Sequence, residues 1–104
     1  MTLARVIGTV VSTHKAVKIE GIKFLLVEKI DALTQKGKND FVVVMDSVGA
    51  GPGEIVFYVT GSSARMTDVT EGRPTDGTII AIVDQIEKDG SYVYRKDKEI
   101  QDAI

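Results

Sequence analysis

The sequence predicts an all-β protein, a small barrel or sandwich, on the strength of three observations. Its apolar residues gather in short segments rich in β-branched side chains, which is typical of strands. Glycine, aspartate, asparagine and proline separate those segments at short intervals, as turns require. No stretch of the 104 residues shows sustained helical periodicity. Many short strands with almost no helix are characteristic of small barrels and sandwiches.

Five segments have the composition of core strands: residues 3–13, 23–30, 41–46, 55–60 and 78–86. A weaker strand at residues 92–95 is expected to close a final hairpin, because the Asp89-Gly90 pair before it is a strong turn signal. Turns are also expected at residues 36–40 and 49–53. One short helix is predicted at residues 62–66, with Ser62 as its N-cap. Residues 1–95 are expected to form a single domain, followed by a polar tail at residues 96–104.

Composition excludes several classes of protein. A hydrophobic fraction of 43% with 27% charged residues is that of a globular domain, not a disordered chain. The net charge of −2 lacks the basic surplus of most nucleic-acid-binding proteins. There is no cysteine, hence no disulfide and no thiolate metal site. The sequence contains no apolar run of membrane-spanning length and no signal-peptide pattern, so we expect a soluble, cytoplasmic protein.

The predicted strands are apolar on both faces. Phe41-Val42-Val43-Val44-Met45 and Ile55-Val56-Phe57-Tyr58-Val59 do not alternate with polar residues, as a strand with one solvated face should. A barrel interior accommodates only one face of each strand. The other faces would form a large exposed apolar surface unless a second subunit covers them, which predicts oligomerisation. The alternative is that a loop of the same chain folds back over them.

The residues suited to catalysis are few. His14 is the only histidine, and its place at a predicted strand end favours a solvated loop residue. Ser62 and Ser63 follow Gly61 but lack the second glycine of a hydrolase nucleophile elbow and a histidine to form a triad. Asp46 and Glu54 flank a glycine-rich loop, where carboxylates usually cap turn amides. No cluster has the spacing of a metal site, so no catalytic residue, cofactor or metal is predicted.

The glycine-rich loop Val48-Gly49-Ala50-Gly51-Pro52-Gly53-Glu54 does not fit a phosphate-binding loop. It lacks the spacing of a dinucleotide fingerprint and the Lys-Ser or Lys-Thr ending of a P-loop, and a strand follows it. Its alternate glycines are expected to allow positive φ angles and a close approach of another backbone, as at a crowded interface. Residues 61–65 suit either an anion or carboxylate contact, with Arg65 as a planar donor, or an ordinary capped turn.

Together these two segments resemble the EutN/CcmL family of bacterial microcompartment vertex proteins. The similarity rests on residues 46–54 and 61–65, on the opening segment 4–13, on residues 21–27, and on Arg73-Pro74-Thr75-Asp76 followed by residues 79–84. It spans roughly residues 3 to 95, with the motifs in the same order. The turn at residues 36–40 is of variable type in the family, and the tail after Arg95 has no clear counterpart.

The resemblance implies a five-stranded OB-like β-barrel that assembles as a cyclic homopentamer. It implies a structural role at the fivefold vertices of a polyhedral shell, in the cytoplasm, with hexameric shell proteins as partners. Candidate residues for a subunit contact or a pore rim are Gly49, Ala50, Gly51, Ser62, Ser63 and Arg65. The competing hypothesis is an OB-type barrel that binds single-stranded nucleic acid or a small ligand. Tyr92 and Tyr94, near Arg95, would be its stacking surface.

Overall fold

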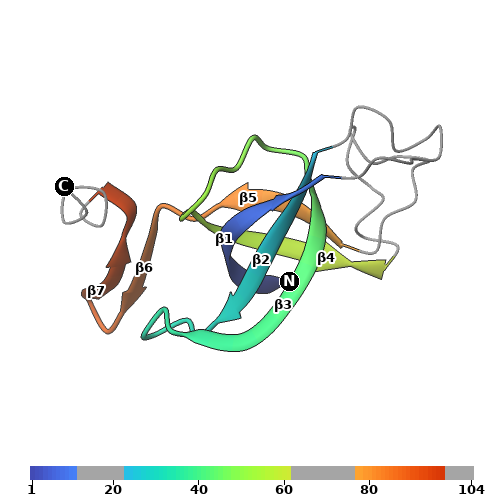
Figure 1. Ribbon diagram of the computed structural model, residues 1–104. Coiled ribbons are helices and arrows are strands. Elements are labelled where there is room, and N and C mark those ends of the chain that lie inside the picture. Colours follow the sequence, from blue (N-terminus) through green and yellow to red (C-terminus); the bar gives the residue numbers. More distant parts are fainter. Residues whose placement is uncertain (12–22, 62–76, 98–104) are drawn as a thin grey trace.

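A computed structural model describes residues 1–11, 23–61 and 77–97. Its elements are seven strands: β1 (Thr2–Val10), β2 (Phe24–Ile30), β3 (Gly37–Asp46), β4 (Ile55–Thr60), β5 (Gly77–Ile82), β6 (Gln85–Lys88) and β7 (Ser91–Arg95). The first five close a barrel in the order β1-β2-β3-β5-β4, and β6 and β7 form a separate two-stranded sheet beside it (Figure 1). The prediction of an all-β, five-stranded barrel is confirmed.

The barrel is antiparallel except where β3 meets β5. That parallel pairing is short, with Met45 opposite Thr78 and Asp46 opposite Ile79. Side chains from alternate positions of each strand fill the interior, as the period of two requires. The core consists of Ala4, Val6, Leu25, Val27, Val44, Ala50, Val56, Tyr58 and Ile79.

Several predicted strand boundaries were wrong; the first strand, predicted over residues 3–13, ends at Val10 as β1. Residues 36–40 do not form the turn; β3 begins at Gly37 and the turn lies at residues 31–36. There the Asp31 carboxylate accepts hydrogen bonds from the amides of Leu33 and Thr34, at 2.9 and 3.0 Å. These bonds lower the pKa of Asp31 and fix the turn earlier, since an aspartate readily caps a local turn.

Glycine at position 37 leaves room for a side chain of the neighbouring strand. The Glu28 carboxylate lies over Gly37, where a Cβ atom would collide with it. The same carboxylate accepts a hydrogen bond from the Asn39 amide at 3.0 Å. The pairing of β2 with β3 therefore continues, through an irregularity, to Ile30 opposite Gly37. Strand pairing thus extends into the segment that local composition predicts as a turn.

The segment predicted as one strand over residues 78–86 divides into β5 and β6. Val83 leaves the barrel sheet, buries its side chain and donates a backbone hydrogen bond to Ile55 at 2.8 Å. The chain then enters the predicted hairpin, whose turn has positive φ at Asp89 and Gly90. This two-residue turn agrees with the Asp-Gly signal.

The predicted helix at residues 62–66 and His14 lie outside the described residues. None of the described elements is a helix long and apolar enough to cross a membrane. The predicted boundary between a domain at residues 1–95 and a tail at residues 96–104 stays a prediction.

The hairpin β6–β7 covers one side of the barrel. Its side chains Ile86 and Tyr94, together with Val83, pack against the outward-facing side chains of Ile55 and Phe57 on β4. Leu3 and Ile30 join the same cluster. We call this cluster the covered face. Strand β4 is thus buried on both sides, with Val56 and Tyr58 in the barrel core, and cover for this region comes from within the chain.

Candidate functional site

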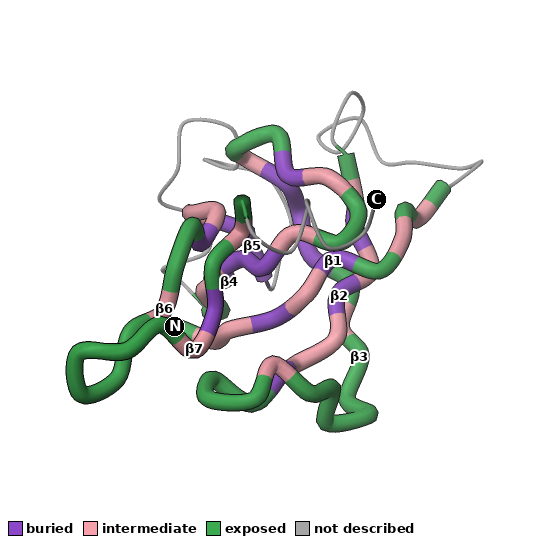
Figure 2. The backbone as a smooth tube through the Cα atoms, turned by 90° about the vertical axis from the view of Figure 1, so that its left-hand side faces the viewer, coloured by how far each residue is buried: buried purple, intermediate pink, exposed green. Residues whose placement is uncertain are grey.

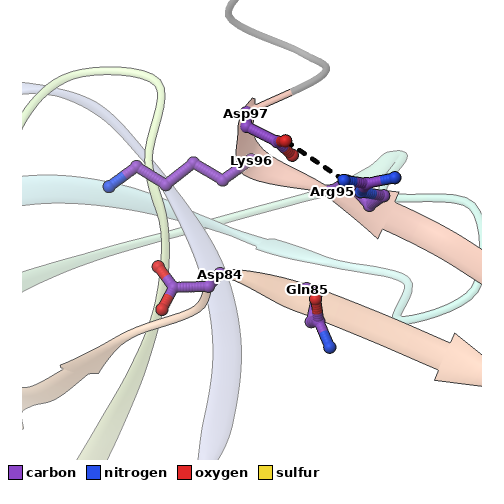
Figure 3. A pocket seen from close by; sticks show the side chains of 5 residues that line it. All are labelled: Asp84, Gln85, Arg95, Lys96 and Asp97. Atoms are coloured by element: carbon purple, nitrogen blue, oxygen red, sulfur yellow. Dashed lines mark hydrogen bonds and ion pairs between the residues drawn. The ribbon is translucent and has the colours of Figure 1, made fainter.

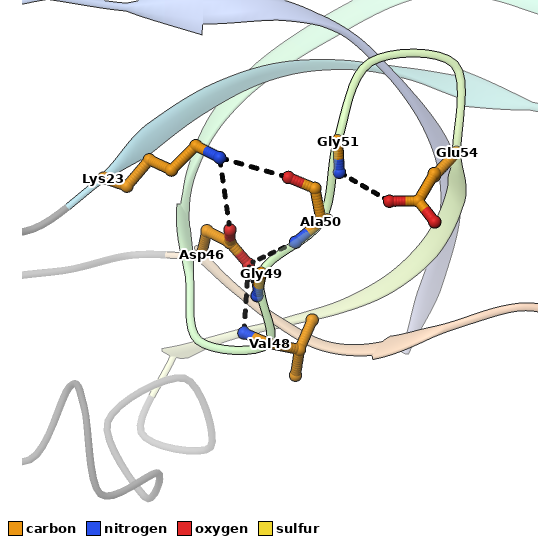
Figure 4. Close-up of polar contacts among 7 residues, drawn as sticks. All are labelled: Lys23, Asp46, Val48, Gly49, Ala50, Gly51 and Glu54. Carbon is orange, nitrogen blue, oxygen red and sulfur yellow. Dashed lines mark hydrogen bonds and ion pairs between the residues drawn. The ribbon is translucent and has the colours of Figure 1, made fainter.

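The loop between β3 and β4 is held at its start by Asp46, the last residue of β3. Its buried side chain accepts hydrogen bonds at Oδ1 from the backbone amides of Val48 and Gly49 at 3.0 Å and of Ala50 at 3.2 Å (Figure 4). Three amides converging on one carboxylate oxygen form a rigid capped turn. The expectation that Asp46 caps turn amides is confirmed.

The other end of the loop is fastened to β1 and to Glu54. The amide of Gly53 donates to the Val6 carbonyl at 2.8 Å, and the Val6 amide donates to the Glu54 carbonyl at 2.9 Å. The Arg5 guanidinium donates to the Gly53 carbonyl at 2.7 Å. Glu54 itself accepts a bond at Oε1 from the amide of Gly51 at 2.6 Å, so the second flanking carboxylate also caps the loop.

The glycines of the loop differ in conformation. Gly49 and Gly53 have φ angles of +78° and +84°, a region that favours glycine. Gly51 has no such angle, so the expectation that all three alternate glycines serve positive φ was wrong for Gly51. A Cβ atom at Gly49 or Gly53 would meet nothing within 4 Å in the described chain. Close packing at these positions does not come from the residues that the structure describes.

Lys23 and Lys96 contact this loop, and sequence analysis assigned neither to the site. Lys23 Nζ lies 3.3 Å from the Ala50 carbonyl and 3.9 Å from Asp46 Oδ2. Lys96 Nζ forms an ion pair with Glu54 Oε2. The Lys23 contact could have been found from strand register. Phe24 of β2 lies opposite Met45 of β3, so the next positions along this antiparallel pair bring Lys23 close to Asp46. The Lys96 contact depends on where the hairpin returns, which no local pattern specifies.

The ion pair shifts both pKa values in the direction that favours the charged forms. The Lys96 ammonium lowers the pKa of Glu54, and the Gly51 amide acts in the same direction against partial burial. Glu54 in turn raises the pKa of Lys96. At neutral pH the loop therefore carries a carboxylate that accepts bonds on both oxygens.

The structure places the candidate interface residues unequally. Gly49 is exposed, Gly51 is half-buried, and the Ala50 side chain is fully buried in the barrel core. Ala50 can thus offer only its backbone to another molecule. Ser62, Ser63 and Arg65 lie outside the described residues, so their predicted role at a contact stays a prediction.

A second surface lies on the outside of β1, β2 and β3. Leu26 stands opposite Val43 and Glu28 opposite Phe41, and directly opposed residues of an antiparallel pair point to the same side. Phe41 and Val43 remain 49% and 48% exposed, and Ile7 on β1 is also exposed (Figure 2). We call Ile7, Leu26, Phe41 and Val43 the open face. No described residue covers it, in contrast with the covered face beneath the hairpin.

The hairpin root has a polar hollow of about 390 Å³, lined by Asp84, Gln85, Arg95, Lys96 and Asp97. Arg95 pairs with Asp97 at 3.2 Å, and the Lys96 side chain points away from both (Figure 3). The lining groups do not converge on a common point. Among the described residues, no three metal-binding side chains lie close enough to hold an ion.

The stacking surface expected for a nucleic-acid-binding barrel is incomplete. Tyr92 is exposed with the Arg95 guanidinium 5.0 Å from its ring centre. Tyr94 points the other way and is only 4% exposed, since it packs in the covered face. Residues two apart in a regular strand point to the same side, so Tyr92 and Tyr94 can differ only if a bulge lies between them. Such a shift occurs between Ile86 and Glu87 in the pairing of β6 with β7.

Comparison with known proteins agrees with the barrel and its loops. The model of the family described as "Ethanolamine utilisation protein EutN/carboxysome" matches residues 1–84. The carboxysome shell vertex protein CcmL of Synechococcus elongatus is 41% identical over 96 residues, which cover 92% of this chain and 96% of the relative. The microcompartment shell vertex protein EutN of Salmonella typhimurium is 42% identical over 98 residues, with 92% and 96% covered.

Solved structures of microcompartment shell proteins are also similar to this chain. The structure of CcmL from Gloeobacter violaceus superposes with a TM-score of 0.87 at 39% identity, covering 93% of this chain and 99% of that one. The pentameric microcompartment shell protein GrpN of Rhodospirillum rubrum superposes with a TM-score of 0.76 at 41% identity, with 85% and 99% covered. A family model over most of the chain and relatives of similar length at about 40% identity confirm the resemblance seen in the sequence: this chain belongs to the EutN/CcmL family.

Proposed function

We propose that this chain is a structural shell protein that forms the pentameric vertices of a polyhedral bacterial microcompartment. The observation that carries the proposal is the match to shell vertex proteins over 92% of the chain. The GrpN structure, described as pentameric, supports assembly into rings of five. The function is geometric: a head-to-tail contact that closes after five copies makes a ring with fivefold symmetry.

The open face supports self-association. Phe41 and Val43 on β3 and Ile7 on β1 expose large apolar side chains, and monomeric proteins rarely leave an extended apolar surface bare. A head-to-tail ring needs two different surfaces on each copy. We assign the open face to one of them. A specific contact of this kind buries at least ~800 Å² on each partner.

The glycine-rich loop is the second proposed contact. Its ends are fastened to β1 and β3, and a Cβ atom at Gly49 or Gly53 would meet no described atom within 4 Å. A preformed backbone surface without side chains suits close packing against another subunit. Gly51→Val tests this role, because Gly51 lacks a positive φ and the substitution should hinder packing between copies more than folding.

The same proposal includes two further points: the ring contacts hexameric shell proteins, and the chain has no catalytic role. A vertex must fit a gap between neighbouring shell tiles, and Arg65 with Ser62 and Ser63 are proposed for a contact within the ring or towards a hexamer. If Arg65 is buried there, Arg65→Ala should weaken association by ~2–5 kcal/mol. Arg65→Lys should restore little of it, because an ammonium lacks the planar fork of a guanidinium.

Native mass spectrometry tests the central proposal. The expected species is about five times the 11.3 kDa chain, with no folded monomer at micromolar concentration. Mixing the protein with purified hexameric shell proteins should then yield closed particles in electron micrographs. A spectrum that shows only the 11.3 kDa species would remove the proposal.

A further inference from the structure

Lys96 begins the segment that composition sets apart as a tail, yet it contacts the glycine-rich loop. Its backbone amide donates to the Asp84 carbonyl at 2.9 Å, which fixes the residue at the root of the hairpin. From there its side chain extends away from Arg95 and Asp97 (Figure 3) and pairs with Glu54 Oε2. A residue next to the hairpin thus reaches the start of β4.

Glu54 uses its two carboxylate oxygens for different partners. One pairs with the Lys96 ammonium, and the other accepts the hydrogen bond from the Gly51 amide at 2.6 Å (Figure 4). The Lys96 and Glu54 side chains are 30% and 20% exposed, so solvent reaches the pair only in part. Pairing restricts the rotamers of the carboxylate and keeps it charged, both of which favour its bond to the amide.

The position of Gly51 makes this bond informative. The first part of the loop is held by Asp46, and the last part by the backbone bonds of Gly53 and Glu54 with Val6. Gly51 lies between these two anchors; its amide donates to the Glu54 carboxylate, and its carbonyl accepts a hydrogen bond from the Glu54 backbone amide at 3.2 Å. Release of the carboxylate should therefore loosen the centre of the loop while both ends stay in place.

We propose that Lys96 is a positioning residue for the glycine-rich loop, which it orders by holding Glu54 against the Gly51 amide. The hairpin root and the loop are then coupled through one carboxylate. This coupling rests on contacts within a single chain. Its consequence for subunit contacts rests on the proposed function, because only a loop that packs against another copy would transmit the coupling to assembly.

Amide exchange measured by NMR on the full-length, assembled protein tests the coupling. In Lys96→Met, which keeps the aliphatic stem and removes the charge, the Gly51 amide should exchange about fivefold to tenfold faster, as expected for the loss of about one hydrogen bond. The amides of Val48 and Gly49, held by Asp46, should keep their rates. Lys96→Arg should retain protection of Gly51, since a guanidinium can also pair with Glu54.

Two further variants complete the design. Lys88→Met removes an exposed lysine from the end of β6, next to the hairpin turn, and should leave Gly51 exchange unchanged. Adding Lys96→Met to Glu54→Gln should accelerate Gly51 exchange no further than Glu54→Gln alone, because both act through one carboxylate. Exchange at Gly51 that is the same in Lys96→Met as in the parent would overturn the proposal.

The effect of Lys96→Met on pentamer formation is measured separately from Gly51 exchange. Faster Gly51 exchange in a variant that still forms pentamers upholds the positioning role and counts against a subunit contact at the loop. Faster exchange with weakened pentamers upholds both. Weakened pentamers without any change at Gly51 would overturn the positioning role while leaving the proposed function intact.

Discussion

The covered face and the open face are built from the same kind of strand but are completed in different ways. On the covered face, Ile55 and Phe57 of β4 lie beneath Ile86 and Tyr94 of the hairpin. On the open face, Phe41 and Val43 of β3 remain about half exposed. The chain thus supplies cover for one side of its barrel and leaves the other without any among its described residues. Strands that are apolar on both faces therefore indicate that a second layer covers the outside of the barrel. They do not indicate whether the same chain or another molecule provides that layer.

This difference separates stability from assembly. Burial of the covered face contributes to the folding of each subunit, since its cover belongs to the same chain. Burial of the open face contributes only when copies associate, and so it favours the ring and not the subunit. Substitutions in the two regions should accordingly affect different measurements.

The largest effect is expected in the covered face. Tyr94→Ala should lower the free energy of unfolding by about 3 kcal/mol, because it removes a buried aromatic ring and leaves a cavity. Tyr92→Ala in the same strand should change it by less than about 0.5 kcal/mol, since that ring is exposed. Urea denaturation of both variants measures the contrast, and equal losses of stability would show that the hairpin does not act as a one-sided cover.

The next largest effect is expected on the open face. Val43→Asp should weaken subunit association by about 2 kcal/mol or more, because a charge is desolvated at an apolar contact. The fold should persist, since the side chain is exposed in the subunit. Native mass spectrometry and circular dichroism report the two quantities, with Val43→Leu as an apolar control. Normal pentamers in Val43→Asp would place the subunit contact elsewhere.

A smaller effect is expected in the glycine-rich loop, which the described part of the chain holds in place by hydrogen bonds at both ends. Gly53→Ala should cost about 1–2 kcal/mol of folding stability, because its φ of +84° disfavours any side chain. Gly51→Ala should cost less than about 0.5 kcal/mol, since that residue has ordinary φ and its Cβ would lie 3.5 Å from Glu54 Oε1. Thermal unfolding compares them; a loss in Gly51→Ala as large as in Gly53→Ala would contradict this assignment.

The smallest effect concerns pH and the ion pair at the hairpin root. Lys96 lowers the pKa of Glu54 below its ordinary 4.5, so the pair stabilises the fold above that pH and its contribution is lost as pH falls through the lowered value. Glu54 raises the pKa of Lys96 above 10.5, so the contribution is also lost as pH rises through the raised value. The small difference in Tm between the parent and Lys96→Met at neutral pH should vanish in acid. A difference that persists unchanged in acid would show that the lost packing of the lysine stem causes it.

Local sequence was sufficient for much of the fold and part of the site. The bounds of β4, the hairpin turn at Asp89 and Gly90, and capping by Asp46 follow from side-chain chemistry within a few residues. The order of glycine-rich and serine-containing motifs was also enough to place the chain in its family. The predicted need for a second apolar layer came from strand composition alone, because the pattern of polar residues records which faces meet water.

Contacts between distant segments decided the rest. The pairing of Ile30 with Gly37 extended β3 into the predicted turn, and the exit of Val83 from the barrel divided one predicted strand into β5 and β6. The same exit carries Tyr94 back onto β4 and Lys96 onto Glu54. The direction in which a chain leaves a sheet depends on packing against residues far away in sequence. Only the tertiary structure therefore determined which apolar face the described residues cover and which they leave exposed.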